Sequence, residues 1–270
     1  MSSASTGFTS QPLSLLRKAV IASASVTRQK NAIHAFTETD VSVPRQQIRD
    51  HASRTGIRIS FTAYLARCLA VTIQRHPGLN AFIAGGRLIF PDQITISVLV
   101  ERELNGERYP EPLVIHDCGA LPVDAIHTRI RNAQQTPPSR LGALSGNRWF
   151  RLIPGFLMKA MIRLADRSVK MGLRYGKLAI TSVGMHCQSP VWFIPHGSAT
   201  VLLTVGSMIN RVVETDSGYE TREHLCLTVS FDHDVVDGAP AARFMQDLTD
   251  EIRSGRELDF LKNQEGVLIC

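Results

Sequence analysis

The residues best suited to chemistry lie near the end of the chain, where an apolar run stops at His233 and turns through Asp237 and Gly238 into a helix. This spacing places an imidazole at the end of a strand, with a carboxylate and a glycine in the turn behind it. Imidazole titrates near neutral pH, and its neutral form can take a proton from a thiol or hydroxyl that attacks a carbonyl. We therefore expect His233 to handle protons.

The same residue types are also found in sites of other kinds. Taken alone, the segment is also typical of an ordinary turn with a capping carboxylate. A metal site is not expected, because neighbouring strand residues point to opposite faces and leave too few convergent ligands. A second set of possible ligands lacks Cys-x-x-Cys or helical spacing, and its cysteines are expected to be structural; it comprises His186, Cys187, His224 and Cys226. No Gly-x-Ser-x-Gly hydrolase turn and no Gly-rich nucleotide loop occurs in the sequence.

Composition places the chain among ordinary globular proteins, with 270 residues, 44% of them hydrophobic and 20% charged. No apolar run approaches the roughly 18 residues of a membrane span, so we expect a soluble protein. Five cysteines without a Cys-x-x-Cys motif favour a reducing compartment, and the cytoplasm is the default expectation. Residues 1–11 are rich in Ser, Thr and Gly and are expected to be disordered.

Strand and helix patterns interleave along the rest of the chain without a strict alternation. Helices are expected at 12–27, 60–76, 123–133, 156–171 and 241–253, with a further helix able to start at Pro44. Strands are expected at 34–43, 81–84, 87–90, 93–100, 112–115, 177–183, 199–207 and 224–231. This order predicts a two-layer α/β (α+β) domain over 12–270, a mixed, largely antiparallel sheet with helices on one side. Proline, glycine and serine from Gln135 to Gly155, followed by a basic helix, indicate a basic insertion at about 136–176.

The net charge of +6 is concentrated in that insertion, since residues 139–177 hold nine Lys or Arg and one acid, Asp166. A solvated helix face is the simplest explanation. The helix also offers four cations that could attract CoA phosphates or an acidic carrier protein: Lys159, Arg163, Arg167 and Lys170. A partner-binding or membrane-surface face is equally open. Nucleic acid is not expected, because no aromatic residues interleave the charges.

Four landmarks in a fixed order resemble the catalytic domain of the 2-oxoacid dehydrogenase (dihydrolipoamide) acyltransferases, which share a fold with chloramphenicol acetyltransferase. The His-x-x-x-Asp-Gly signature stands at 233–238. The others are Arg-Lys-Ala-Val-Ile-Ala at 17–22, His-Pro-Gly-Leu-Asn-Ala at 76–81 and Ile-Thr-Ser-Val-Gly-Met at 180–185. The resemblance covers most of the chain and implies a trimer with its active site in a channel between subunits.

The resemblance also implies roles for individual residues. His233 takes the place of the general base, and a hydroxyl on the facing subunit stabilises the tetrahedral oxyanion. The family's serine falls on Thr181, with Ser182 as the alternative donor in the position of an asparagine. The motif carboxylate, Asp237, would pair structurally with Arg17. Asp234 departs from the family's usual arginine, with no consequence that the sequence reveals.

The sequence shows no lipoyl-domain Asp-Lys-Ala motif and no subunit-binding domain, so it resembles a stand-alone catalytic domain without a lipoyl group of its own. The expected activity is acyl transfer between a CoA or carrier thioester and a thiol, hydroxyl or amine acceptor. The expected partners are acyl-CoA or an acyl-carrier protein and copies of this chain as a homotrimer, with higher assembly open. Two alternatives remain: a non-catalytic scaffold core, and a condensation or cyclisation enzyme using the same site.

Overall fold

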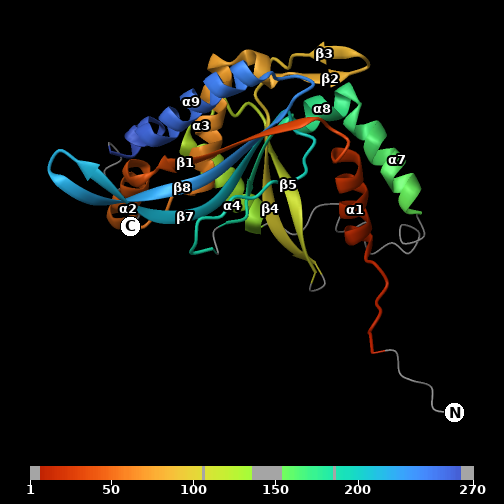
Figure 1. Ribbon diagram of the computed structural model, residues 1–270, viewed down its shortest axis with the longest axis horizontal. Coiled ribbons are helices and arrows are strands. Elements are labelled where there is room, and N and C mark those ends of the chain that lie inside the picture. The colour runs from red at the N-terminus through yellow and green to blue at the C-terminus, as the bar shows by residue number, and fades with distance from the viewer. Residues whose placement is uncertain (1–6, 105–106, 136–153, 185–186, 263–270) are drawn as a thin grey trace, which may run out of the picture.

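A six-stranded mixed sheet forms the centre of the protein (Figure 1). The computed structural model describes residues 7–104, 107–135, 154–184 and 187–262. In spatial order the strands are β1 (Ala32–Asp40), β8 (Gly218–Asp232), β7 (Val201–Thr215), β6 (Leu178–Ser182), β4 (Ile96–Leu104) and β5 (Glu107–Ile115). Parallel pairing joins β4 to β6 and β6 to β7, and the other neighbours are antiparallel. The predicted mixed, largely antiparallel sheet is confirmed.

Helices cover one face of this sheet. They are α2 (Ser42–Thr55), α3 (Phe61–Arg75), α4 (Val123–Gln135) and α9 (Gly238–Ser254), with the 3-10 turns η1 (Pro77–Asn80) and η2 (Arg256–Lys262). The predicted helix at 60–76 is α3, whose apolar residues recur at helical spacing and pack on the sheet. Every second strand residue, such as Leu203 and Val229, points into this core.

The opposite face, which we call the second face, carries the intervening strand residues and has no helix of this set on it. Residues 187–200 cross it on the way from β6 to β7 (Figure 1). The Val191 N–H donates to Ser207 Oγ at 2.9 Å, and the Trp192 indole N–H donates to the Thr37 carbonyl at 3.1 Å. These bonds fasten the crossing segment to β7 and β1.

A separate hairpin of β2 (Phe82–Ala84) and β3 (Arg87–Ile89) stands beside the sheet, as the sequence predicts. Gly85 and Gly86 make its turn, both with positive φ of 57° and 73°. A two-residue turn of this type requires positive φ at both positions, which glycine adopts without strain.

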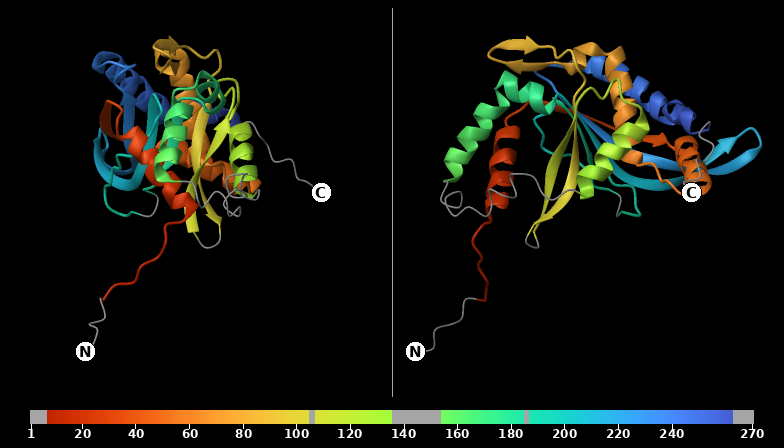
Figure 2. Two further views of the ribbon diagram at one scale, coloured as in Figure 1. Left: turned by 90° about the vertical axis from the view of Figure 1, so that its right-hand side faces the viewer. Right: turned by 180° about the vertical axis from the view of Figure 1, so that it is seen from behind.

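The helix predicted at 156–171 is wrong in its continuity, because the chain forms two helices there, α7 (Gly155–Asp166) and α8 (Val169–Tyr175). Ser168 interrupts the run, and its hydroxyl caps α8 by accepting from the Met171 N–H. Helix α7 packs beside α1 (Leu15–Thr27), away from the helices that cover the sheet (Figure 2). Within the described residues, no helix combines the length and apolar character needed to cross a bilayer.

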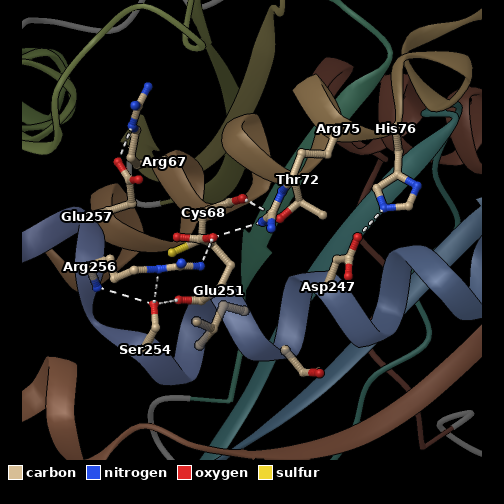
Figure 3. Close-up of polar contacts among 12 residues, drawn as sticks. Arg67, Cys68, Thr72, Arg75, His76, Asp247, Glu251, Ser254, Arg256 and Glu257 are labelled. Atoms are coloured by element: carbon tan, nitrogen blue, oxygen red, sulfur yellow. Dashed lines mark hydrogen bonds and ion pairs between the residues drawn. The ribbon is translucent and has the colours of Figure 1, made fainter.

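A polar network joins α3 to α9 (Figure 3). Glu251 has a side chain only 3% exposed, and its Oε2 accepts from Arg75 at 2.8 Å and from Arg256 at 2.9 Å. The residue after Arg75, His76, has its Nε2 2.7 Å from Asp247, one helical turn before Glu251 on α9. Because a buried carboxylate is costly without partners, these bonds fix how α9 lies on α3. Helix α9 begins at Gly238, after the short turn that starts at His233, so its position constrains where the candidate site lies.

Candidate active site

His233 is the first residue after β8 and stands at an open end of the sheet. Its N–H donates to the Asn31 carbonyl at 2.7 Å, which extends the β1–β8 pairing by one bond. The imidazole is 44% exposed, and its Nδ1 lies 3.9 Å from Asp237 Oδ1. The side chain is thus held by a fixed backbone and remains open to a substrate.

A buried carboxylate one residue earlier holds the turn in place. Asp232 is 8% exposed, and its Oδ2 lies 2.9 Å from Lys30 Nζ. Its Oδ1 accepts the Asp234 N–H at 3.2 Å. Lys30 is also 3.8 Å from Asp166, which binds Lys177 at 2.6 Å. These four residues form what we call the charge cluster, with two cations and two anions.

The charge cluster connects three distant parts of the chain to the turn that carries His233. Burial lowers the pKa of Lys177, while its hydrogen bond to Asp166 acts in the opposite direction. The Lys177 Nζ also donates to the Ser198 carbonyl at 3.3 Å. Asp166 is the last residue of α7. Through its ion pairs with Lys30 and Lys177, this part of the predicted insertion is attached to the turn that carries His233.

The expected ion pair between Asp237 and Arg17 is not formed among the described residues of this protomer. Asp237 is 88% exposed, and its recorded ion pair is the long one to His233. Arg17 is exposed on α1, where its N–H receives the Ser14 cap. Lys30 and Asp232 form the buried ion pair at the base of this turn. Gly238 is the first residue of α9. The space around it is open, because a Cβ added at this position would meet no atom of the described chain within 4 Å.

Thr181 and Ser182, the two candidate oxyanion donors, point to opposite faces of the sheet. Leu178 and Ile180 lie in the helix-covered core, so by strand alternation Thr181 belongs to the second face. Ser182 belongs to the helix side and lines a hollow with Ser60 and Thr62. Its hydroxyl is buried and has no hydrogen-bond partner within the described residues. Thr181 and Ser182 therefore cannot both serve one site on a single face of the sheet.

One protomer does not bring Thr181 and His233 together. Thr181 is in register with Thr204, which is in register with Thr228. His233 lies five residues further along β8 and two strands across, so the two side chains are roughly 19 Å apart at ordinary strand rise and spacing. A base and an oxyanion donor acting on one carbonyl must both lie within about 3 Å of the reacting atoms. A site that uses both residues must take them from two protomers.

The four cations of the basic helix are spread over α7, its C-cap and α8. Lys159 and Arg163 lie on α7, Arg167 caps it, and Lys170 lies on α8. Arg163 donates to Gln29 Oε1 at 2.5 Å and so helps to dock α7 on α1. Among the described residues, none of the four lines the hollow that Lys30 and Asp232 border. Their role as CoA ligands remains a prediction.

Sequence reasoning missed Lys30 and Asp232 as site residues. They lie 202 positions apart, and the contact depends on the register of β1 with β8, which pairs Ala32 with Asp232. The sequence carries one usable signal, a carboxylate as the last residue of an apolar strand, because a buried carboxylate requires a partner.

Known proteins resemble this chain in both sequence and fold. The family model described as "2-oxoacid dehydrogenases acyltransferase (catalytic domain)" matches residues 6–137 and 170–258. The chain belongs to this family. The unmatched residues 138–169 fall inside the segment predicted as a basic insertion.

Among curated relatives of this acyltransferase family, the chain is 25% identical over 242 residues to the dihydrolipoyllysine-residue acetyltransferase component of the pyruvate dehydrogenase complex of Mycoplasma capricolum. The aligned segment covers 87% of this chain and 48% of that protein. The lipoamide acyltransferase component of the Bacillus subtilis branched-chain complex is also 25% identical, with 87% and 50% covered. The chain thus spans about half the length of these relatives.

Solved structures confirm the acyltransferase fold. A probable dihydrolipoamide acetyltransferase from Listeria monocytogenes superposes with a TM-score of 0.67 at 19% identity, covering 93% of this chain and 96% of that one. A chloramphenicol acetyltransferase superposes with a TM-score of 0.50 at 14% identity, covering 85% and 93%. Both the family and the fold inferred from the four landmarks are therefore confirmed.

Proposed function

We propose that this protein transfers an acyl group between a CoA or carrier thioester and a thiol, hydroxyl or amine acceptor, with His233 as the general base. The observation that carries the proposal is the exposed imidazole on a rigid strand end in a member of the acyltransferase family. The Asn31 carbonyl and the charge cluster fix the backbone beneath it. A base held this way needs little reorganisation when the nucleophile arrives.

The proposed reaction proceeds by direct attack. His233 removes the proton from the acceptor as the acceptor bonds to the thioester carbonyl carbon. Thr181 of a neighbouring protomer donates its hydroxyl to the resulting oxyanion. The tetrahedral intermediate collapses, the carbon–sulfur bond breaks, and the imidazolium returns its proton to the leaving thiolate. No acyl-enzyme forms, so both substrates must be bound at once and the kinetics are sequential.

The placement of Thr181 supports a site that lies between two subunits, and the family resemblance implies that these subunits form a homotrimer. Thr181 belongs to the second face, and within one protomer it is too far from His233 to act on the same carbonyl. A closed ring of three copies would repeat one contact three times and complete three identical sites.

The test measures CoA release from acyl-CoA in the presence of dihydrolipoamide. His233→Ala should lose about 10²- to 10⁴-fold in kcat/KM, the usual contribution of a general base. His116→Ala is a matched control, because that imidazole is exposed on the loop after β5. Near-normal turnover by a folded His233→Ala protein would refute the assignment, and absence of transfer by the wild-type protein would favour a scaffold core.

A further inference from the structure

Helix α7 turns an apolar face toward solvent. It has no fully buried residue, and its exposed positions recur three and four residues apart, which is the spacing of one helix face. Between 156 and 164 all of the exposed residues are apolar, and we call them the outer stripe: Phe156, Leu157, Ala160, Met161 and Leu164. Phe156 is 77% exposed and Leu164 is 74% exposed. A surface helix normally turns such a face toward the core, so this one indicates a contact outside the protomer.

The opposite side of α7 is already occupied by α1. Arg163 donates to Gln29 Oε1 at 2.5 Å, and Asp166 lies 3.8 Å from Lys30. Figures 1 and 2 show α7 at the outer margin of the molecule, at the end opposite α2. The contacts with α1 fix which side of α7 faces outward, so the outer stripe belongs to the surface of the folded protomer.

Positive charge borders the outer stripe along one edge. At about 100° of rotation per residue, Arg163 and Arg167 each lie about 20° from the direction of Phe156. Lys159 lies about 60° from it on the side away from the stripe. Two exposed cations follow on α8, Lys170 and Arg174.

The charge at this edge is not balanced within the segment. Residues 154–177 hold six Lys or Arg and a single acid, Asp166. Lys30 and Lys177 already engage that carboxylate. The edge of the outer stripe therefore keeps a net positive charge, which attracts anionic surfaces.

An apolar stripe with a cationic edge fits an anionic lipid surface. In helices that lie in a bilayer interface, Phe and Leu enter the acyl boundary while Lys and Arg stay with the headgroups. The outer stripe spans an arc of about 140°, from Phe156 to Met161, so a flat surface can contact all of it with α1 in place. A second copy of this chain on the same face would bring the same cations together, and their repulsion opposes that contact.

We propose that α7 and α8 bind this protein peripherally to membranes that contain anionic lipids. The outer stripe enters the interface, and the cations along its edge contact the lipid headgroups. Each cation near such a surface contributes about fivefold in affinity, and added salt reduces this contribution. The family model leaves residues 138–169 unmatched, so α7 lies outside the segments that match the acyltransferase family. Membrane binding is therefore an addition to the proposed transfer reaction and does not depend on it.

The test measures co-sedimentation of the whole chain with phosphatidylcholine vesicles, alone or with about 30 mol% phosphatidylserine. At low salt we expect the anionic vesicles to bind at least about tenfold more tightly than the neutral ones, and high salt should weaken this binding. The double variant Phe156→Ser/Leu164→Ser should lose about tenfold or more in affinity, because it removes the two most exposed apolar side chains of the outer stripe. Arg167→Gln/Lys170→Gln should lose about 25-fold.

Matched controls change residues of the same kind elsewhere. Val212→Ser/Tyr219→Ser alters side chains of β7 and β8 that are 71% and 78% exposed. Arg58→Gln/Arg253→Gln removes two charges from exposed positions outside α7 and α8. Both controls should bind anionic vesicles as the wild type does. Phe156→Trp reports insertion directly: its emission should shift to the blue on anionic vesicles, and the emission of Tyr219→Trp should not.

Several results would overturn the proposal. One is wild-type protein that stays in solution with anionic vesicles at low salt, whether or not it then binds an acidic protein. Another is full binding by Phe156→Ser/Leu164→Ser, which would reduce the effect to charge alone. If light scattering shows that this variant breaks up the wild-type oligomer, the outer stripe is an interface between copies of the chain. An unshifted Phe156→Trp emission would exclude insertion even where another variant failed to fold.

Discussion

The composite site makes a prediction that subunit mixing can test. His233→Ala removes the proposed base, and Thr181→Ala removes the proposed oxyanion donor. Each variant alone should lose activity, by about 10²- to 10⁴-fold for the base and about 10²- to 10³-fold for the donor. Within one protomer the two residues are roughly 19 Å apart at ordinary strand geometry, so the defects should fall on different halves of each site.

The recovery expected on mixing follows from the symmetry of a ring. In a trimer each site takes its histidine from one subunit and its threonine from the next. Any trimer holding both variants, in either ratio, has one interface at which an intact His233 faces an intact Thr181. Mixed trimers should therefore recover about a third of wild-type activity. This is a gain of about 30-fold or more over either parent.

The assay uses co-expressed variants with two different affinity tags, purified in succession so that only mixed oligomers remain. CoA release is then measured per oligomer against wild-type protein carrying the same tags. A doubly substituted protein mixed with wild type provides the control: it should also retain one site in trimers with two wild-type subunits and none in the others. If mixed oligomers of the single variants remain as inactive as their parents, the shared-site reasoning is wrong.

Three further predictions concern the elements around the site. Asp232→Asn should lower the free energy of unfolding by about 2 kcal/mol, because it breaks the largely buried pair with Lys30, whereas the exposed Asp237→Asn should change it by less than about 0.5 kcal/mol in urea titrations. Glu251→Gln should cost about 1.5–3 kcal/mol by the same measurement, and Asp250→Asn, in an exposed pair with a 3.7 Å separation, should cost close to nothing. Burial lowers the pKa of His51 in the folded protein below the ordinary histidine value of 6.5, so near and below that pH the unfolded state binds more protons at this residue than the folded state does. The urea midpoint should therefore fall as the pH drops from about 7.5 to 5.5. The fall should be smaller in His51→Gln.

Local sequence patterns predicted the elements that contact the core along their whole length. The helix expected at 60–76 is α3 (Phe61–Arg75), and the one expected at 241–253 lies within α9 (Gly238–Ser254). The strands expected at 199–207 and 224–231 are instead β7 to Thr215 and β8 from Gly218. Their outer parts form an exposed two-stranded arm of polar residues, and pairing between strands, which no local pattern encodes, holds it together.

The candidate site divides in the same way. The placement of His233 at a strand end, ahead of a turn and a helix, could be predicted because these features are all local in the sequence. The faces on which Thr181 and Ser182 lie depend on which side of β6 meets the core, and the packing of Ile180 beneath the helices determines this. The contact between Trp192 and Thr37 depends on a segment folding over the second face. Such contacts join residues more than 150 positions apart and are set by the whole topology.

The charge cluster shows why a motif carboxylate need not keep its expected role. Asp232 is the last residue of β8, and its side chain points at Lys30. Asp237 lies after the turn, and its side chain is exposed to solvent. A carboxylate stabilises a turn when it is desolvated and paired, and an exposed one contributes little. Because Lys30 and Lys177 balance Asp166 and Asp232, the cluster fixes the backbone of His233 without adding net charge near the reacting carbonyl. The backbone that carries the imidazole is thus held by one ionic arrangement.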